Sequence, residues 1–175
     1  MTPSLLCRRI AVASILLLST CVAGHARNPY TRGEKSFGPR VGFVSRNSSA
    51  LGGLMFQYSF SRHVRIAPEA SIVFRHKNLD ALMVDIDMQF PLQLESDRMA
   101  FYPILGLDFT SWNRHHVQEG SKKDVSNHVN RFGANAGAGF EIRCTPTLKV
   151  FLEAKYTLVK TYPGATLAAG LAYVF

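Results

Sequence analysis

In residues 167–175, at the end of the chain, successive side chains fall alternately on the two faces of a predicted strand. One set is Leu167, Ala169, Leu171, Tyr173 and Phe175, and the residues between them are alanine, glycine and valine. An apolar strand left at the edge of a sheet in water would pair with other chains through its unpaired N–H and C=O groups. Closing the sheet into a barrel removes the edge, and within lipid only a closed barrel satisfies a sheet's backbone. The pattern therefore predicts a closed barrel.

The same period of two recurs along the chain, interrupted at strand-length intervals by turn residues. The predicted strands before the last one are 40–46, 53–61, 64–75, 81–93, 99–112, 131–142 and 148–159. Several of them reach the 9–11 residues that a tilted strand needs to cross a bilayer. Eight strands also place both ends of the wall on one side of the membrane. The sequence thus predicts an all-β, eight-stranded, antiparallel up-and-down transmembrane β-barrel.

Residues 1–26 have the three parts of a secretory signal peptide. Arg8 and Arg9 precede an apolar core at 10–18, and Gly24-His25-Ala26 offers small residues at a cleavage position. The apolar core is too short to span the hydrocarbon as a helix. We expect a polar periplasmic lead-in at 27–38 and the barrel domain at 39–175. Lipidation at Cys21 stays open as an alternative.

The predicted connections differ in length from one end of the barrel to the other. The even-numbered connections are compact, which is typical of periplasmic turns, and the third connection, 113–130, is long and therefore expected outside the cell. It carries basic residues and His115, His116 and His128. Histidines can bind zinc, but no carboxylate or thiol completes a ligand spacing, so we expect no metal. A host or envelope protein is the partner expected for this loop.

Alternation alone does not decide which face of the barrel is outside. A soluble lipocalin-like barrel would turn its apolar face inward. The polar face of this chain is rich in small residues such as Gly106, Gly137 and Gly139, which suits a narrow bore better than a solvated exterior. We therefore expect the apolar face to contact lipid. A soluble, secreted, ligand-binding barrel remains the alternative.

The charged residues of the predicted strands fall on the polar face, where we expect them to interlock as ion pairs in a filled lumen. The predicted lumen charge network is Arg65, Glu69, Arg75, Asp85, Asp87, Asp108, Glu141, Lys149, Glu153 and Lys155. A wide pore is not expected, because open channels need about 16 strands. No catalytic residues and no cofactor are predicted from this set.

Four segments together resemble a known family. They are 102–106, 132–141, 153–156 and 170–175, with a terminal Phe175. In their order they are similar to the small eight-stranded bacterial outer-membrane barrels of the OmpX and OmpA transmembrane-domain type, also described as the outer membrane protein beta-barrel domain. The resemblance implies a cell outer-membrane location and a C-terminal signal, Leu171, Tyr173 and Phe175, that the barrel-assembly machinery reads.

The family includes adhesins, structural proteins, resistance factors and a few enzymes of lipid A or phospholipid. Lipid A deacylase barrels share a His-x-Ser strand motif, which is absent from this sequence, so the resemblance favours a protein that is not an enzyme. We expect a structural, envelope or surface-interaction role through the external loops. A lipid-modifying barrel enzyme stays the alternative.

The formal net charge of +8 indicates anionic partners. For an exported chain these are outer-membrane lipids and lipopolysaccharide phosphates, and no nucleic-acid partner is expected. Removal of the signal peptide would leave Cys144 as a lone cysteine, so no intramolecular disulfide is expected.

Overall fold

The computed structural model describes residues 32–76, 79–94, 98–117, 124–159 and 163–175. These residues form strands and turns, and they include no helix with the length and apolarity needed to span a membrane. The strands are β1 (Lys35–Val44), β2 (Ser49–Ser59), β3 (Arg65–His76), β4 (Leu79–Gln89), β5 (Leu92–Gln93), β6 (Met99–Val117), β7 (Asp124–Thr145), β8 (Leu148–Val159) and β9 (Gly164–Val174).

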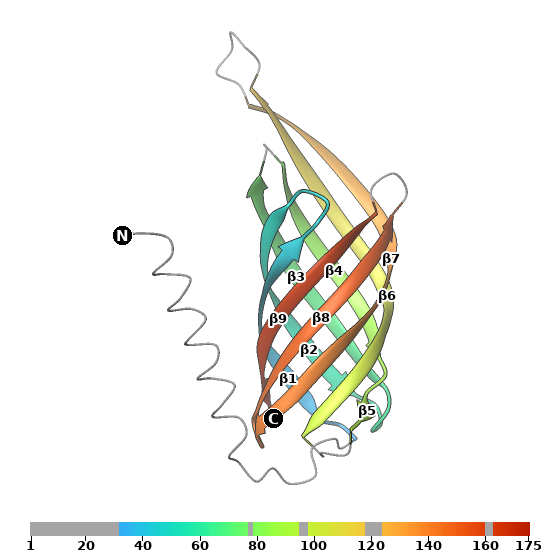
Figure 1. Ribbon diagram of the computed structural model, residues 1–175. Coiled ribbons are helices and arrows are strands. Elements are labelled where there is room, and N and C mark those ends of the chain that lie inside the picture. The colour runs from blue at the N-terminus through green and yellow to red at the C-terminus, as the bar shows by residue number, and fades with distance from the viewer. Residues whose placement is uncertain (1–31, 77–78, 95–97, 118–123, 160–162) are drawn as a thin grey trace, which may run out of the picture.

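The strands form one closed antiparallel barrel (Figure 1). Consecutive strands pair from β1 to β4 and from β5 to β9, β1 pairs with β9, and β4 pairs with β6. The short β5 continues the pairing of β4 along β6 after an interruption at Phe90 and Pro91. Pro91 has no N–H for a sheet ladder, whereas Phe90 still donates to the Pro103 carbonyl at 3.0 Å. The wall therefore contains eight strands, as the sequence predicts.

The register of the pairs shows how far the strands are staggered around the wall. A path from partner to partner that leaves β1 at Lys35 returns to β1 at Ser45. It runs through Lys35, Tyr58, Ile66, Met88, Leu105, Ala136, Tyr156, Ala165 and Ser45. The stagger is thus ten residues, from position 35 to position 45. With eight strands, a stagger of this size tilts the strands by about 40° and leaves a bore that side chains can fill.

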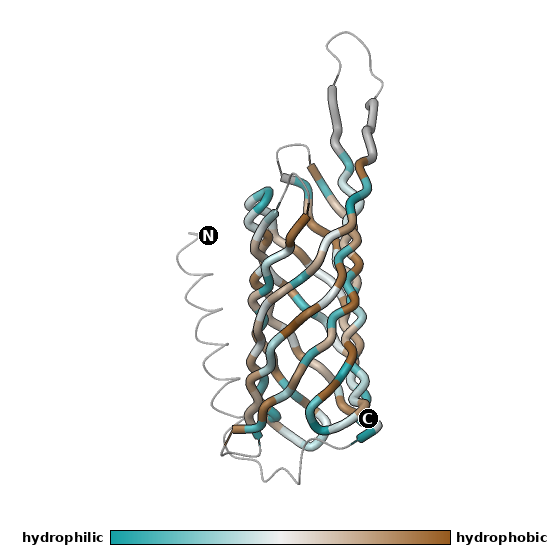
Figure 2. The backbone as a smooth tube through the Cα atoms, turned by 90° about the vertical axis from the view of Figure 1, so that its right-hand side faces the viewer, coloured by the Kyte–Doolittle hydropathy of each residue, from teal (hydrophilic) through white to brown (hydrophobic). Residues whose placement is uncertain are grey.

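Hydrophilic and hydrophobic residues alternate along the strands (Figure 2), and their burial places them on opposite faces of the wall. Ile86, Leu105 and Leu152 are 51%, 57% and 51% exposed on the outside. Asp87 and Glu153, which follow Ile86 and Leu152 in the sequence, lie in the bore with at most 1% exposure. Asp108 on β6 lies there too. Charged side chains inside and leucines outside are the arrangement of a transmembrane barrel. The lipocalin-like alternative, which needs the reverse arrangement, is wrong.

Two of the differences in strand bounds change the predicted division of the chain into lead-in, wall and loop. β1 begins at Lys35, so 35–38 belong to the wall rather than to the predicted lead-in 27–38. Gly38 and Pro39 suggested a loop, but an inward Gly38 allows the close approach of β9, and Pro39 removes only one ladder donor. The predicted signal peptide, 1–26, lies outside the described residues.

The second difference concerns the predicted external loop, 113–130. Most of it is strand, because β6 continues to Val117 and β7 begins at Asp124. Both strands extend beyond the ends of the others and form a two-stranded ribbon (Figure 1). We call this end of the barrel the external end, and the end that holds Lys35 and Phe175 the periplasmic end, following the usual asymmetry of such barrels.

Candidate functional site

The middle of the bore holds one ammonium group among three carboxylates. Lys155 Nζ donates to Asp85 Oδ2 at 2.9 Å, to Asp87 Oδ2 at 2.8 Å and to Glu69 Oε1. The three acids come from the neighbouring strands β3 and β4, and Lys155 reaches them from β8 across the bore. Carboxylate oxygens of these acids lie close enough together to hold a metal ion. The Lys155 ammonium takes that place, so the residues present do not call for a metal.

A second cation connects this group to the rest of the bore. Arg40 on β1 forms ion pairs with Glu69 and, at 3.7 Å, with Glu153 on β8. Arg40 is 2% exposed. Arg40 is missing from the predicted lumen charge network, because Arg40 was the first residue of the strand predicted at 40–46. The strict alternation of Arg40 with the outward Val41 was the signal that could have placed it in the bore.

Closer to the periplasmic end, Arg65 and Glu141 form an ion pair with two close contacts. Arg65 Nη1 donates to Glu141 Oε1 at 2.8 Å, and Arg65 Nη2 lies 2.8 Å from Oε2. Lys149 Nζ adds a charge 3.7 Å from the same Oε2. The Arg65 guanidinium also lies over the Tyr102 ring, 4.5 Å from its centroid. Because both carboxylate oxygens contact the guanidinium, the pair fixes the orientation of Glu141 as well as its charge.

Neutral polar groups connect the two clusters. Tyr102 donates its hydroxyl hydrogen to Glu153 Oε1 at 3.0 Å, and Gln89 Nε2 donates to the same oxygen at 2.9 Å. Gln57 Nε2 donates to Gln89 Oε1 at 3.1 Å. Burying charge in a bore of low dielectric is unfavourable unless each charge is paired and hydrogen-bonded. The network supplies an ion pair for each of these charges and uses side chains from β1 to β4 and from β6 to β8.

Glycines give the largest side chains of the bore their space. A Cβ at Gly139 would overlap the Tyr102 ring, and one at Gly170 would overlap the Phe151 ring. Tyr102 and Phe151 are 0% and 1% exposed. The glycine-rich inner face that the sequence analysis took as a sign of a narrow bore therefore accommodates rings that fill it.

The external end of the bore is apolar, which the sequence analysis did not predict. A buried cluster there consists of Val44, Leu51, Val73, Ala81, Met83 and Trp112. Beside it, Arg46 in the β1–β2 turn donates to the Thr157 carbonyl at 3.4 Å. Burial lowers the pKa of the Arg46 guanidinium, and the carboxylates of Asp108 and Asp85 oppose this shift. Hydrophobic packing thus occupies one end of the bore, and the Arg143–Glu34 ion pair, at 2.6 Å, lies at the other.

Nine of the ten residues of the predicted lumen network lie in the bore, and one does not. Asp108, the ninth, accepts a hydrogen bond from Thr110 at 2.9 Å. Arg75 is the exception: its side chain is 54% exposed and lies 3.5 Å from Asp80. The β3–β4 pairing shifts register between Val73 and His76, and a bulge of this kind breaks the inward and outward alternation. Arg75 is therefore an external surface residue.

The predicted C-terminal signal residues lie on the outer face at the periplasmic end. Leu171, Tyr173 and Phe175 are 40%, 56% and 62% exposed, and the rings of Tyr173 and Phe175 stack with centroids 6.3 Å apart. Phe175 exchanges backbone hydrogen bonds with Lys35. These residues are accessible from the membrane side of the wall.

Cys144 is disulfide-bonded in the full chain. The expectation of a lone Cys144 concerns the chain without residues 1–26, and it stays a prediction. Cys7 and Cys21 lie outside the described residues, as does the alternative of lipidation at Cys21.

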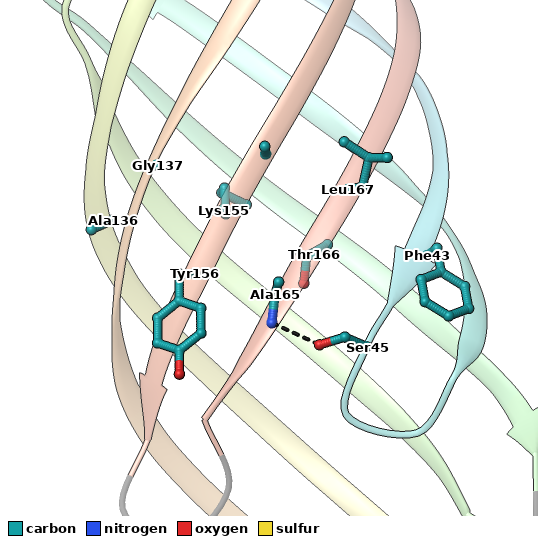
Figure 3. A pocket seen from close by; sticks show the side chains of 10 residues that line it. Phe43, Ser45, Ala136, Gly137, Lys155, Tyr156, Ala165, Thr166 and Leu167 are labelled. Atoms are coloured by element: carbon teal, nitrogen blue, oxygen red, sulfur yellow. Dashed lines mark hydrogen bonds between the residues drawn. The ribbon is translucent and has the colours of Figure 1, made fainter.

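A hollow of about 470 Å³ lies on the outer wall, over β1, β7, β8 and β9 (Figure 3). Ala136, Ala154 and Ala165 line it together with the larger Phe43 and Tyr156. The Ala165 N–H donates to Ser45 Oγ at 2.8 Å at its edge. Lys155 also borders the hollow, but its ammonium group is bound to carboxylates in the bore.

The comparisons with known proteins agree with this architecture. No family model matches the chain, and no curated protein matches its sequence. The N-terminal β-barrel domain of Pseudomonas aeruginosa OprF superposes with a TM-score of 0.67 at 14% identity, covering 82% of this chain and 98% of that one. Yersinia pestis Ail, the attachment invasion locus protein, gives 0.59 at 15% identity, covering 83% and 100%. Neisserial surface protein A gives 0.57 at 14% identity, covering 81% and 95%. The chain therefore has the fold of the small eight-stranded outer-membrane β-barrels.

Proposed function

We propose that this protein is an integral outer-membrane barrel that does not conduct solutes and that acts at the cell surface through the β6–β7 ribbon. One observation carries the proposal: large side chains are buried in the bore while the ribbon extends beyond the rim. Arg40, Arg65, Tyr102 and Phe151 are at most 2% exposed. A bore occupied in this way supports the external surface as the working part of the molecule.

The names of two similar barrels support a surface role. Ail is an attachment invasion locus protein, and the Neisserial protein is a surface protein. For this chain, we propose lipids and lipopolysaccharide as the medium around the barrel, the barrel-assembly machinery as the partner during insertion, and a host or envelope protein as the partner of the ribbon. The proposal includes no catalytic step, and no observation favours a lipid-modifying enzyme.

Two measurements test the proposal. The purified full chain, reconstituted in a planar bilayer, should give no stepwise conductance, because charged and aromatic side chains fill the bore. Resolved open-channel steps would contradict the filled-bore part of the proposal.

A truncated chain tests the role of the ribbon. In this variant an Asn-Gly turn replaces 113–128, joining the paired residues Trp112 and Val129 through a two-residue hairpin. We expect the truncated barrel to insert and to show the same heat-modifiable gel migration as the full chain. We also expect cells that carry it to lose the attachment to protein-coated surfaces that the full chain gives. Equal attachment by both variants would contradict the surface role.

A further inference from the structure

Lys35 is a charged residue on the outer face of the wall, at the periplasmic end of β1. The next residue, Ser36, is 1% exposed and donates to Gln57 in the bore at 2.8 Å. Lys35 is exposed, so the alternation of the strand places its side chain outside. A charge on the outer face of a membrane barrel is unfavourable at the midplane and tolerated near the interfaces. Lys35 therefore lies at the level of the lipid headgroups.

Aromatic rings surround Lys35 on the outer face. Lys35 pairs with Tyr58 on β2, and on its other side it exchanges backbone hydrogen bonds with Phe175. The outward positions one step nearer the middle of the wall are aromatic as well, and so is the outward position that follows Tyr58 on β2. We call Lys35 and these rings the Lys35 patch; its aromatic residues are Phe37, Phe56, Tyr58, Phe60, Tyr173 and Phe175.

Two further cations lie beside the Lys35 patch. Arg62 is exposed in the turn between β2 and β3, two residues after Phe60. Arg32 is exposed before β1, and the N–H of the following Gly33 donates to the Ser59 carbonyl on β2 at 2.8 Å. This backbone bond holds the segment before β1 against the end of β2. The three cations therefore gather over the ends of two neighbouring strands.

Acidic side chains at this end of the described wall do not neutralise these cations, because they have partners of their own. They are Glu34 and Glu141. Glu34 forms its ion pair with Arg143 at 2.6 Å, and Glu141 lies 2.8 Å from Arg65. The three surface cations thus present a net positive charge to the headgroups around the wall.

We propose that the Lys35 patch, together with Arg32 and Arg62, binds the headgroup of an anionic phospholipid such as phosphatidylglycerol. The phosphate oxygens accept hydrogen bonds from the ammonium and guanidinium groups. A zwitterionic headgroup adds an ammonium group that the three cations repel, whereas an anionic headgroup adds none. The inference assigns one lipid class and one place to the proposed lipid environment, and it does not depend on the ribbon.

The apolar part of the Lys35 patch favours a lipid over a soluble phosphate compound. Aromatic rings of this kind gather where a membrane meets water. Two residues beyond Phe56 and Tyr173, towards the middle of the wall, the outward side chains are Leu54 and Leu171, which are 50% and 40% exposed. Cations, rings and leucines thus follow one another in the order of a phosphate, a glycerol backbone and acyl chains.

Lipid titration of the purified full chain in detergent tests the inference. Native mass spectrometry counts the bound molecules of dioleoyl phosphatidylglycerol or dioleoyl phosphatidylethanolamine. The first phosphatidylglycerol should bind about tenfold or more tightly than the first phosphatidylethanolamine, because three cations contribute. Equal affinities would overturn the inference. Excess inorganic phosphate should leave the lipid bound, and complete displacement by it would show a site for phosphate rather than for lipid.

Single charge removals locate the binding. Lys35→Gln and Arg62→Gln should each weaken the first phosphatidylglycerol about fivefold, since each removes one cation near the headgroup. Arg75→Gln is the matched control, because it removes the same charge from a side chain that is 54% exposed at the external end. It should bind as the wild type does. Wild-type binding by both test variants, or an equal loss in the control, would contradict the assigned place.

Photocrosslinking in nanodiscs of mixed phospholipids gives a second, independent readout. Phe37→p-benzoylphenylalanine places the probe in the Lys35 patch, and Leu105→p-benzoylphenylalanine places it on the outer face of β6. With equal amounts of phosphatidylglycerol and phosphatidylethanolamine, position 37 should capture an excess of phosphatidylglycerol, while position 105 should capture the two lipids in their bulk ratio. The same ratio at both positions would overturn the inference and leave the proposed surface role of the ribbon untouched.

Discussion

Lys155 Nζ lies 2.8 Å from Asp87 Oδ2, and the carboxylates of Glu69 and Asp85 lie beside that of Asp87. Replacing Lys155 by Met would leave three carboxylates facing one another in a buried bore. Removing one partner of a buried ion pair costs about 3–5 kcal/mol, so Lys155→Met should lower the free energy of unfolding by about that amount. Urea titration in detergent micelles measures the change.

Calcium provides a second measurement on the same variant, because carboxylate oxygens are the ligands that Ca²⁺ prefers. Refolding Lys155→Met with millimolar Ca²⁺ should restore part of the lost stability. Lys149→Met is the control, since Lys149 faces the Glu141 carboxylate at 3.7 Å and no group of three acids. A calcium effect of equal size in the control would contradict the explanation.

Arg65 and Glu141 should behave as one energetic unit. Each single change, Arg65→Met or Glu141→Gln, leaves a charge buried without its bidentate partner, whereas the double change removes both charges. The double variant should therefore be less destabilised than the sum of the two, with a coupling of about 1–3 kcal/mol. A double-mutant cycle on urea unfolding gives this value, and additive losses would show that the pair is not coupled.

Gly139 and Tyr102 should be tested together, because the ring occupies the space above the glycine. Gly139→Val should slow or prevent barrel folding, since overpacking of a filled interior costs about 1–3 kcal/mol. Tyr102→Ala in the same chain should restore folding by removing the ring. Heat-modifiable gel migration reports the folded fraction. A Gly139→Val chain that folds like the wild type would contradict the assigned contact.

Trp112 is the single tryptophan of the chain, and its side chain is only 6% exposed in the bore. Brominated acyl chains should therefore quench its fluorescence little, because the barrel wall separates the indole from lipid. Leu107 is 69% exposed on the outside. The Leu107→Trp, Trp112→Phe double variant should be strongly quenched, and equal quenching of both chains would contradict the orientation of the wall.

Deletion of Phe175 tests the proposed assembly signal. The shortened chain loses an exposed ring and the backbone bonds to Lys35, so less of it should reach the outer membrane in cells. Phe175→Tyr is the control and should insert normally. If purified protein lacking Phe175 also fails to fold in detergent, the residue acts through barrel closure rather than through recognition by the machinery.

The sequence predicted elements best where polar and apolar residues alternated without interruption. The bounds of β8 agree with the prediction 148–159, because Lys149, Glu153 and Lys155 alternate with apolar residues along its whole length. The ribbon was missed because residues 113–130 are polar on both faces, so the period of two gives no signal there. The start of β1 was missed because Gly38 and Pro39 have the composition of a turn.

The bore could be predicted in its residue types but not in its contacts. Arg65 and Glu141 are 76 residues apart, and which acid an arginine meets depends on the stagger of the strands. No local pattern reports this stagger. The aliphatic cluster at the external end was missed for a related reason, since Leu51, Val73 and Met83 occupy the inward positions that elsewhere hold charges, and only the closed wall brings them together.

The pairing of β1 with β9 joins the two most distant parts of the described wall. Every other strand pairs with strands close to it in the chain, but this seam needs both ends of the described wall. Until the seam forms, the sheet has two open edges, and nothing separates an inner face from an outer one. Closing the seam removes both edges and is therefore the step that creates the bore.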